Sequence, residues 1–74
     1  MDRTELLKSL VARGVDAGAL SISGVPDDDQ LVLAQEGAMW VVYFHERGKR
    51  VEEQVFASES DACQAFFARA SGWG

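Results

Sequence analysis

Hydrophobic and polar residues change their spacing along the chain, and this change divides the sequence into helical and extended segments. Four apolar residues near the start recur at helical spacing: Leu6, Leu7, Leu10 and Val11. They predict a helix over residues 3–13 whose single apolar stripe packs in the core. Asp2 occupies the capping position with Glu5 three residues later, and Gly14 supplies the left-handed residue that ends such a helix.

The middle of the chain alternates instead, which is the pattern of a strand. Residues 39–45 contain no formal charge and no helix breaker, and Val, Tyr, Phe and Trp dominate them. The alternation gives this strand two faces, with Trp40, Val42 and Phe44 on one and Val41, Tyr43 and His45 on the other. The first face holds the larger purely apolar set, so we expect it to face the core.

Turn residues mark the ends of two neighbouring strands. Residues 30–34 predict a strand, and the turn that follows at 35–37 ends in a glycine that can adopt positive φ. After a second turn at 46–49, residues 50–56 predict the last strand. Its apolar positions alternate poorly, so we expect a bulge, or a register in which only the end of the strand is deeply buried.

The segment before these strands is ambiguous. Leu20 and Ile22 alternate with serines, so residues 19–23 are either a short edge strand or irregular. Residues 24–29 contain one proline and three consecutive aspartates, which oppose regular structure, and we expect a loop there.

The last segment is helical again. Ser58 is followed three residues later by Asp61, which is the spacing of a capping box. The apolar stripe of this helix comprises Ala62, Cys63, Phe66, Phe67 and Ala70. Gly72 closes the helix, and Trp73 either folds back onto the core or extends freely.

These elements predict one small α+β domain over residues 1–74, in the order α-β-β-β-α, with or without an extra short edge strand. Short hairpin loops make neighbouring strands antiparallel, so we expect an antiparallel meander sheet. Each helix has one apolar side to cover, so both helices should pack on the sheet face that carries Trp40. The opposite face should then be open to water or to a partner.

Composition narrows the classes of function. The chain has 74 residues, of which 47% are apolar, a single cysteine and a formal net charge of -5. A single cysteine excludes an internal disulfide and suits a reducing compartment. Nucleic-acid binding is not expected, since it needs a basic surface. The basic cluster of the chain, Arg47, Lys49 and Arg50, is interpreted as a solvated turn. No apolar run is long enough for a membrane span, and the acidic start does not match a signal peptide, so we expect a cytoplasmic protein.

Candidate catalytic and metal-binding groups are few. His45 is the only histidine, and no motif places a nucleophile beside it, so we interpret it as a surface residue. Cys63 lies on an apolar stripe, where it acts as a small hydrophobe. Residues 27–29 are adjacent acids, whereas calcium loops need acids at alternate positions, a glycine and a distant glutamate. The sequence therefore predicts no enzyme, no cofactor and no metal site.

The acidic residues instead suggest a surface for contact with a basic partner. Tyr43 and Trp73 are candidate aromatic anchors, because aromatic side chains give much contact energy at a low cost in entropy. The predicted partner-binding residues are Asp27, Asp28, Asp29, Glu36, Tyr43, His45, Glu52 and Glu53.

The second half of the chain resembles small bacterial immunity-type proteins of polymorphic or contact-dependent toxin systems. In that family a strand of the form W-x-V-Y-Y precedes S-E-R-G, a strand ending in Phe, and a helix that opens with acids before Ala-Cys. The matching positions here are residues 40–48, Val55, Phe56, Glu59, residues 61–63 and Phe66. His45 departs from the pattern, which has Ser at this position.

The resemblance implies an inhibitor that binds its cognate toxin, often a basic nuclease, and covers the active site with an acidic surface. It implies no catalytic residue, because such proteins work by binding, and it leaves open a monomer or a weak homodimer. The residues also allow another class of function. This alternative is a small regulatory or adaptor domain whose copies join through the open sheet face, with Val41 and Tyr43 buried between them, or through an edge strand.

Overall fold

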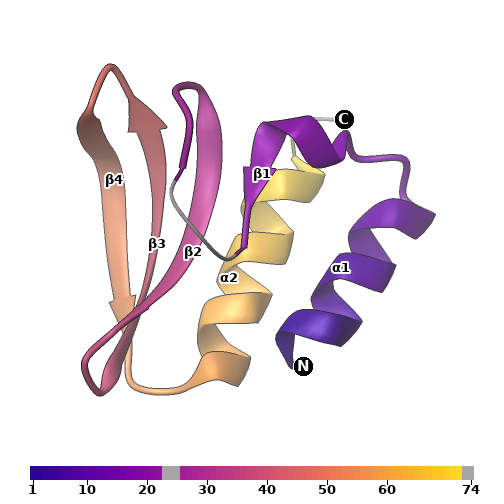
Figure 1. Ribbon diagram of the computed structural model, residues 1–74. Helices are drawn as coiled ribbons and strands as arrows, with labels where there is room; N and C mark the ends of the chain where they lie inside the picture. The colour runs from indigo at the N-terminus through magenta and orange to yellow at the C-terminus, as the bar shows by residue number, and fades with distance from the viewer. Residues whose placement is uncertain (23–25, 73–74) are drawn as a thin grey trace.

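The structure is a computed structural model that describes residues 1–22 and 26–72. The chain runs through α1 (Arg3–Ala12), the 3-10 turn η1 (Ala17–Ala19), β1 (Leu20–Ser21), β2 (Gln30–Glu36), β3 (Met39–Glu46), β4 (Lys49–Phe56) and α2 (Glu59–Ser71). Figure 1 shows one sheet with two helices beside it. The predicted α+β class is confirmed, and the ambiguous segment near Leu20 does form a short strand. Trp73 lies outside the described residues.

The sheet has the strand order β1-β2-β3-β4 and is mixed, whereas the sequence predicted a purely antiparallel meander. The β2–β3 and β3–β4 pairs are antiparallel hairpins. In contrast, β1 pairs with β2 in parallel, with Leu20 opposite Leu31 and Ser21 opposite Val32. A parallel pair requires the connection to return along the whole strand. Because β1 is only two residues long, the short segment before Gln30 is enough for that return.

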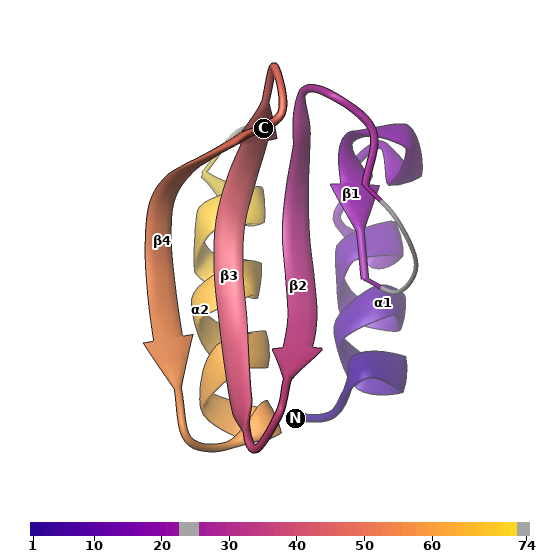
Figure 2. The same cartoon turned by 60° about the vertical axis from the view of Figure 1, so that its left-hand side comes forward.

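Both helices pack on the sheet face that carries Trp40, as predicted. Figure 2 shows the sheet with both helices behind it. The main core combines Leu6 and Leu10 of α1 with Phe66 of α2, and all three are fully buried. From the sheet, Trp40 and Val42 join the same cluster. The other face of the sheet is not covered by any helix among the described residues.

The predicted α1 stripe is only half buried, which is a correction. Leu6 and Leu10 are 0% exposed, but Leu7 is 46% and Val11 is 63% exposed. Successive helical residues are turned by about 100°, so Leu7 and Val11 point about 100° away from the residues that precede them. Since α1 packs chiefly against α2 at one side of the sheet, it buries a narrower stripe than the sequence offers.

The ends of the elements follow the local chemistry of the sequence. The Asp2 carboxylate accepts a hydrogen bond from the Glu5 amide at 2.9 Å, and the Ser58 hydroxyl accepts one from the Asp61 amide at 3.1 Å. These two caps satisfy amides that have no partner inside their helices. Among the described residues, neither helix has the length and apolarity needed to cross a membrane.

β2 ends two residues later than predicted, because it continues through Gln35 and Glu36 and leaves only Gly37 and Ala38 in the turn before β3. Gly37 has φ +61°. The β3–β4 turn also has two central residues, Arg47 with φ 50° and Gly48 with φ 75°. Positive φ at both central positions matches the right-handed twist of the flanking strands.

The predicted bulge is confirmed. Val42 lies opposite Gln54, and Phe44 lies opposite Val51, so β4 has one extra residue between these pairs. Glu52 in this interval has φ 53°, the left-handed region that is uncommon for a residue with a side chain. The extra residue changes which side chains of β4 share a face with those of β3, and this change determines the layout of the candidate site.

Candidate functional site on the open face of the sheet

The open face has an apolar floor although no helix packs on it. Val32, Val41 and Tyr43 form a second buried cluster, with exposed fractions of 1%, 3% and 5%. The register places Val32 directly opposite Tyr43, and Ala34 opposite Val41. Because no helix packs there, neighbouring side chains of the sheet must cover this floor, and Ala34 is one of them.

Arg50 is a side chain that covers this floor. Its guanidinium carbon lies 4.4 Å from the centre of the Tyr43 ring, which is a close cation–π contact. Nη1 donates to Oε1 of Glu36 at 2.9 Å, Nη2 donates to the other oxygen of the same carboxylate, and Nη1 also donates to Glu53. We call Glu36, Tyr43, Arg50 and Glu53 the arginine clamp.

The clamp shifts the titration of its own charged groups. The hydrogen bond from Arg50 holds the pKa of Glu36 below its ordinary value of 4.5. The hydrogen bonds to Glu36 and Glu53, in that order of importance, raise the pKa of Arg50 above its ordinary value. The Glu36 carboxylate and the Arg50 guanidinium are therefore charged at neutral pH. With two carboxylates and one guanidinium, the clamp has one more acidic than basic side chain.

His45 of β3 contacts residues 27–29, which we call the aspartate loop. Its Nδ1 atom lies 3.0 Å from the carbonyl oxygen of Asp27 and 3.5 Å from Oδ1 of Asp28. The Asp29 amide donates to the His45 carbonyl at 2.7 Å. The side chain of Gln30 also accepts from the Asp27 amide at 2.8 Å. These contacts fix the loop beside β3, so that Asp27 and Asp28 extend the acidic rim of the open face.

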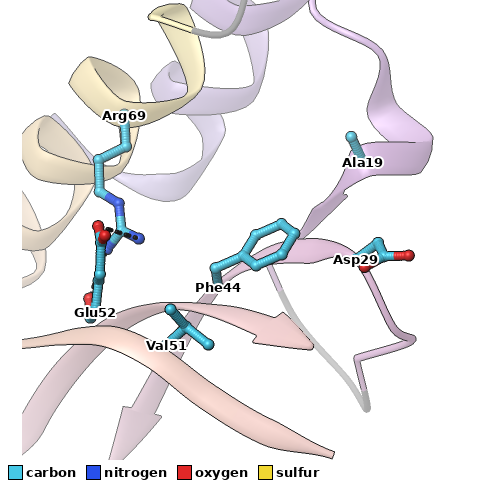
Figure 3. Close-up of a pocket in the computed structure, with 6 residues that line it drawn as sticks. All are labelled: Ala19, Asp29, Phe44, Val51, Glu52 and Arg69. Carbon is cyan, nitrogen blue, oxygen red and sulfur yellow. Dashed lines mark hydrogen bonds and ion pairs between the residues drawn. The ribbon is translucent and has the colours of Figure 1, made fainter. Parts of the chain in front are cut away.

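Glu52 does not join that rim, because the bulge turns it toward the helices. Arg69 of α2 donates from Nη1 to the Glu52 main-chain carbonyl at 2.9 Å, and its Nη2 lies 3.8 Å from Oε2 of Glu52. The two side chains form one end of a groove beside β3 and β4, whose remaining lining is Ala19, Asp29, Phe44 and Val51 (Figure 3). Arg69 thus fastens the bulge to α2.

The structure therefore divides the eight sequence-predicted contact residues into two groups. The open-face group is Asp27, Asp28, Glu36, Tyr43, His45 and Glu53. Asp29 and Glu52 instead line the groove of Figure 3. Tyr43 lies beneath Arg50, so it supports the surface more than it projects from it. On the open face, two carboxylates bind the Arg50 guanidinium, and Asp28 lies beside His45. This excess of acidic side chains can attract cationic groups.

Arg50 is the organising residue that sequence reasoning missed, because it was interpreted as part of a solvated basic turn. The missed signal is the length of that turn. With two central residues at 47 and 48, Arg50 must pair with His45, as the register shows. It then shares a face with Tyr43, at the distance where a long side chain reaches a diagonal neighbour.

Cys63 lies in the core between the helices and the sheet, on the side opposite the clamp. Burial raises the pKa of the Cys63 thiol above its ordinary value, so this side chain is protonated at neutral pH and belongs to the core. Within residues 1–22 and 26–72, no three His, Cys, Asp or Glu side chains are grouped so that they could hold a metal ion. Two exposed apolar side chains, Met39 and Val55, share the open face with the clamp. The open face thus carries both exposed apolar side chains and charged side chains, as protein interfaces commonly do.

Comparison with known proteins gives no relative for this chain. No protein-family model, no curated protein and no solved structure matches it.

Proposed function

We propose that this protein is an immunity-type inhibitor, which binds a basic protein toxin and covers its active site with the acidic open face of the sheet. The observation that supports this proposal is the arginine clamp. It lies over Tyr43 on the face opposite both helices and brings Glu36 and Glu53 together there. An acidic surface complements the basic cleft of an enzyme that acts on an anionic substrate such as nucleic acid.

The mechanism is stoichiometric and needs no catalytic group. Unbalanced carboxylates at Asp27, Asp28 and the clamp would steer a basic toxin toward this face and raise the rate of association. The exposed side chains of Met39 and Val55 would then lose water at the interface and slow dissociation. Because the acids would occupy the cleft that binds anionic substrate, binding and inhibition would be the same event.

The test is co-expression with the toxin encoded beside this gene, followed by co-purification of the two proteins. The wild-type chain should restore growth and should bind the toxin at a ratio of one to one. The double variant Glu36→Gln/Glu53→Gln removes both carboxylates of the clamp, and we expect it to associate about tenfold more slowly at low salt. If the wild-type chain neither protects cells nor co-purifies with the toxin, the proposal is wrong.

A matched control removes two carboxylates from the helical side. Glu5 and Asp61 lie in the first turns of α1 and α2, and both are exposed. The double variant Glu5→Gln/Asp61→Asn has the same net charge as the clamp variant. It should associate at close to the wild-type rate, because these groups lie away from the proposed contact. Equal losses in both variants would show that total charge, and not the open face, determines binding.

The alternative of a homodimer through the open face gains no support from burial. Val41 and Tyr43, which this dimer was expected to bury, are already 3% and 5% exposed in the single chain. A second copy would also bring two acidic rims together, and like charges at an interface are unfavourable. Sedimentation at increasing protein concentration tests this point, and we expect a monomer.

A further inference from the structure

We infer that Tyr43, Glu36 and Glu53 form a binding site for a guanidinium group, that Arg50 of the same chain occupies this site, and that an arginine of the partner exchanges with Arg50 on binding. The inference deepens the proposed function and depends on it for the identity of the partner. The site itself can be tested without any partner.

The site has three walls, which are the side chains of Tyr43, Glu36 and Glu53. They suit a guanidinium group better than an ammonium group. The Tyr43 ring offers a flat π surface, 4.4 Å from the guanidinium carbon. Glu36 receives hydrogen bonds on both carboxylate oxygens, and Glu53 receives a third. Only a planar cation with several divergent N–H donors can stack on the ring and satisfy both carboxylates together. Arg50 thus demonstrates the chemistry that the site selects.

The walls are held independently of their occupant. Glu36 ends β2, Tyr43 lies in the middle of β3, and Glu53 follows the bulge of β4. The ladders of these three strands fix all three backbones, and Arg69 of α2 also binds the bulge at Glu52. Removal of the Arg50 side chain should therefore leave the ring and the two carboxylates in place.

The occupant is held more loosely than the walls. The side chain of Arg50 is 41% exposed, and those of Glu36 and Glu53 are 46% and 38% exposed. Ion pairs with this exposure are weak, because water and salt compete with them. A partner arginine would replace the contacts of Arg50 one for one, while Arg50 would become free for a carboxylate or carbonyl on the partner.

Self-occupation has a consequence for selectivity. The apparent affinity of the site for an external cation is reduced by the fraction of molecules in which Arg50 has left. Free arginine should thus bind poorly to the wild-type protein. A basic protein surface, which offers further contacts along the acidic rim, can displace Arg50. The clamp would in this way discriminate against isolated small cations.

The test is a titration of the purified chain with Nα-acetyl-arginine methylamide, followed by the NMR signals of the Tyr43 ring and of the β2, β3 and β4 amides. The variant Arg50→Ala should bind this probe at least about tenfold more tightly than wild type does. The largest shifts should fall on Tyr43, Glu36 and Glu53. The lysine analogue, Nα-acetyl-lysine methylamide, should bind the same variant several-fold more weakly.

A second pair of variants identifies the walls. Arg50→Ala/Glu53→Gln should lose most of the gain in affinity, whereas Arg50→Ala/Glu5→Gln, which removes a carboxylate on α1, should retain it. The inference is wrong if Arg50→Ala binds the probe no better than wild type, or if the arginine and lysine probes bind it equally. Shifts spread over the helices would also contradict it.

The variant Arg50→Lys protects the test against a failure to fold. It keeps a cation on β4 but can neither stack as a plane nor form the paired bonds to Glu36. If Arg50→Ala is unfolded by circular dichroism, Arg50→Lys should bind the arginine probe more tightly than wild type does, and equal binding would overturn the inference. No toxin is present in this titration, so a failure to bind the probe rejects the guanidinium site but not the proposed function. If the probe binds but the chain does not protect cells from the toxin, the proposed function is rejected and the guanidinium site stands.

Discussion

Replacing Leu10 by alanine tests the packing of α1, because Leu7 on the same helix provides an internal control. Leu10 is 0% exposed and Leu7 is 46% exposed. Removal of a buried leucine side chain beyond Cβ forfeits about 0.8 kcal/mol for each methylene, and the cavity that remains brings the total to about 2–5 kcal/mol. At Leu7 about half of the transfer energy is at stake and no closed cavity forms, so we expect a loss of about 1 kcal/mol or less.

These losses differ strongly in relation to the total stability. A chain of 74 residues has an expected free energy of unfolding of about 4–11 kcal/mol, from about 0.05–0.15 kcal/mol per residue. Leu10→Ala should therefore remove a large fraction of that stability, and Leu7→Ala only a small one. The change in intrinsic helix propensity is the same for both substitutions. It therefore cancels from the comparison.

The measurement is urea unfolding of both variants, followed by circular dichroism at 222 nm with a shared m-value. The midpoint should fall steeply for Leu10→Ala and little for Leu7→Ala. A loss at Leu7 equal to the loss at Leu10 would refute the reasoning. It would mean that the outer side of α1 is covered in solution, or that α1 is rotated about its axis.

Three further predictions concern the bulge, the clamp and the cysteine. Arg69→Met should lower the free energy of unfolding in urea by about 1–3 kcal/mol, because Arg69 donates to the Glu52 main-chain carbonyl. Glu52→Ala keeps that carbonyl and should lower it less. A larger loss for Glu52→Ala would refute the view that the main-chain bond is the important contact of Arg69. The pKa of Glu36 is lower in the folded than in the unfolded chain, so its stabilising contribution is present above about pH 4.5 and is lost as the pH falls through the folded value. Thermal melts should show a weaker acid dependence for Glu36→Gln, and an unchanged dependence would contradict this. Cys63 should resist a thiol reagent at pH 8 until urea unfolds the chain, because burial raises the pKa of its thiol. Rapid labelling of the native protein would contradict the burial of Cys63 in the core.

Local features of the sequence predicted a large part of the fold. The caps at Asp2 and Ser58 and the turn at Gly48 depend on neighbouring residues, so they could be identified without tertiary information. The alternation around Trp40 also identified the covered face of the sheet, because the two faces of β3 differ clearly in polarity.

The sequence could not predict features that depend on how elements meet. The parallel pairing of Leu20 with Leu31 depends on which strand β1 meets and in which direction, and the pattern of β1 itself does not contain this information. The exposure of Leu7 and Val11 depends on where α1 sits beside α2. Periodicity shows how wide an apolar stripe is, but it does not show how much of that stripe a neighbour will cover.

The candidate site was predicted in composition but not in arrangement. One bulged residue moved Glu52 from the acidic rim to the helical side, where Arg69 binds its carbonyl. The two-residue turn at 47–48 placed Arg50 opposite His45 and over Tyr43, so a residue interpreted as a solvated cation became the centre of the open face. A bulge inserts one extra residue, so the side chains beyond it lie on the opposite face from the one that simple alternation predicts. The position of the bulge cannot be derived from alternation alone.

The central claim is that the acidic open face, and not the helical side, is the contact surface. The most direct measurement is an NMR footprint of the isotope-labelled chain bound to the proposed toxin, which we expect the adjacent gene to encode. We expect the amide and side-chain signals of Tyr43, Arg50, Glu36 and the Asp27–Asp28 loop to shift or broaden, while those of α1 and α2 keep their positions. A footprint confined to α1 and α2, with the clamp unchanged, would contradict the account.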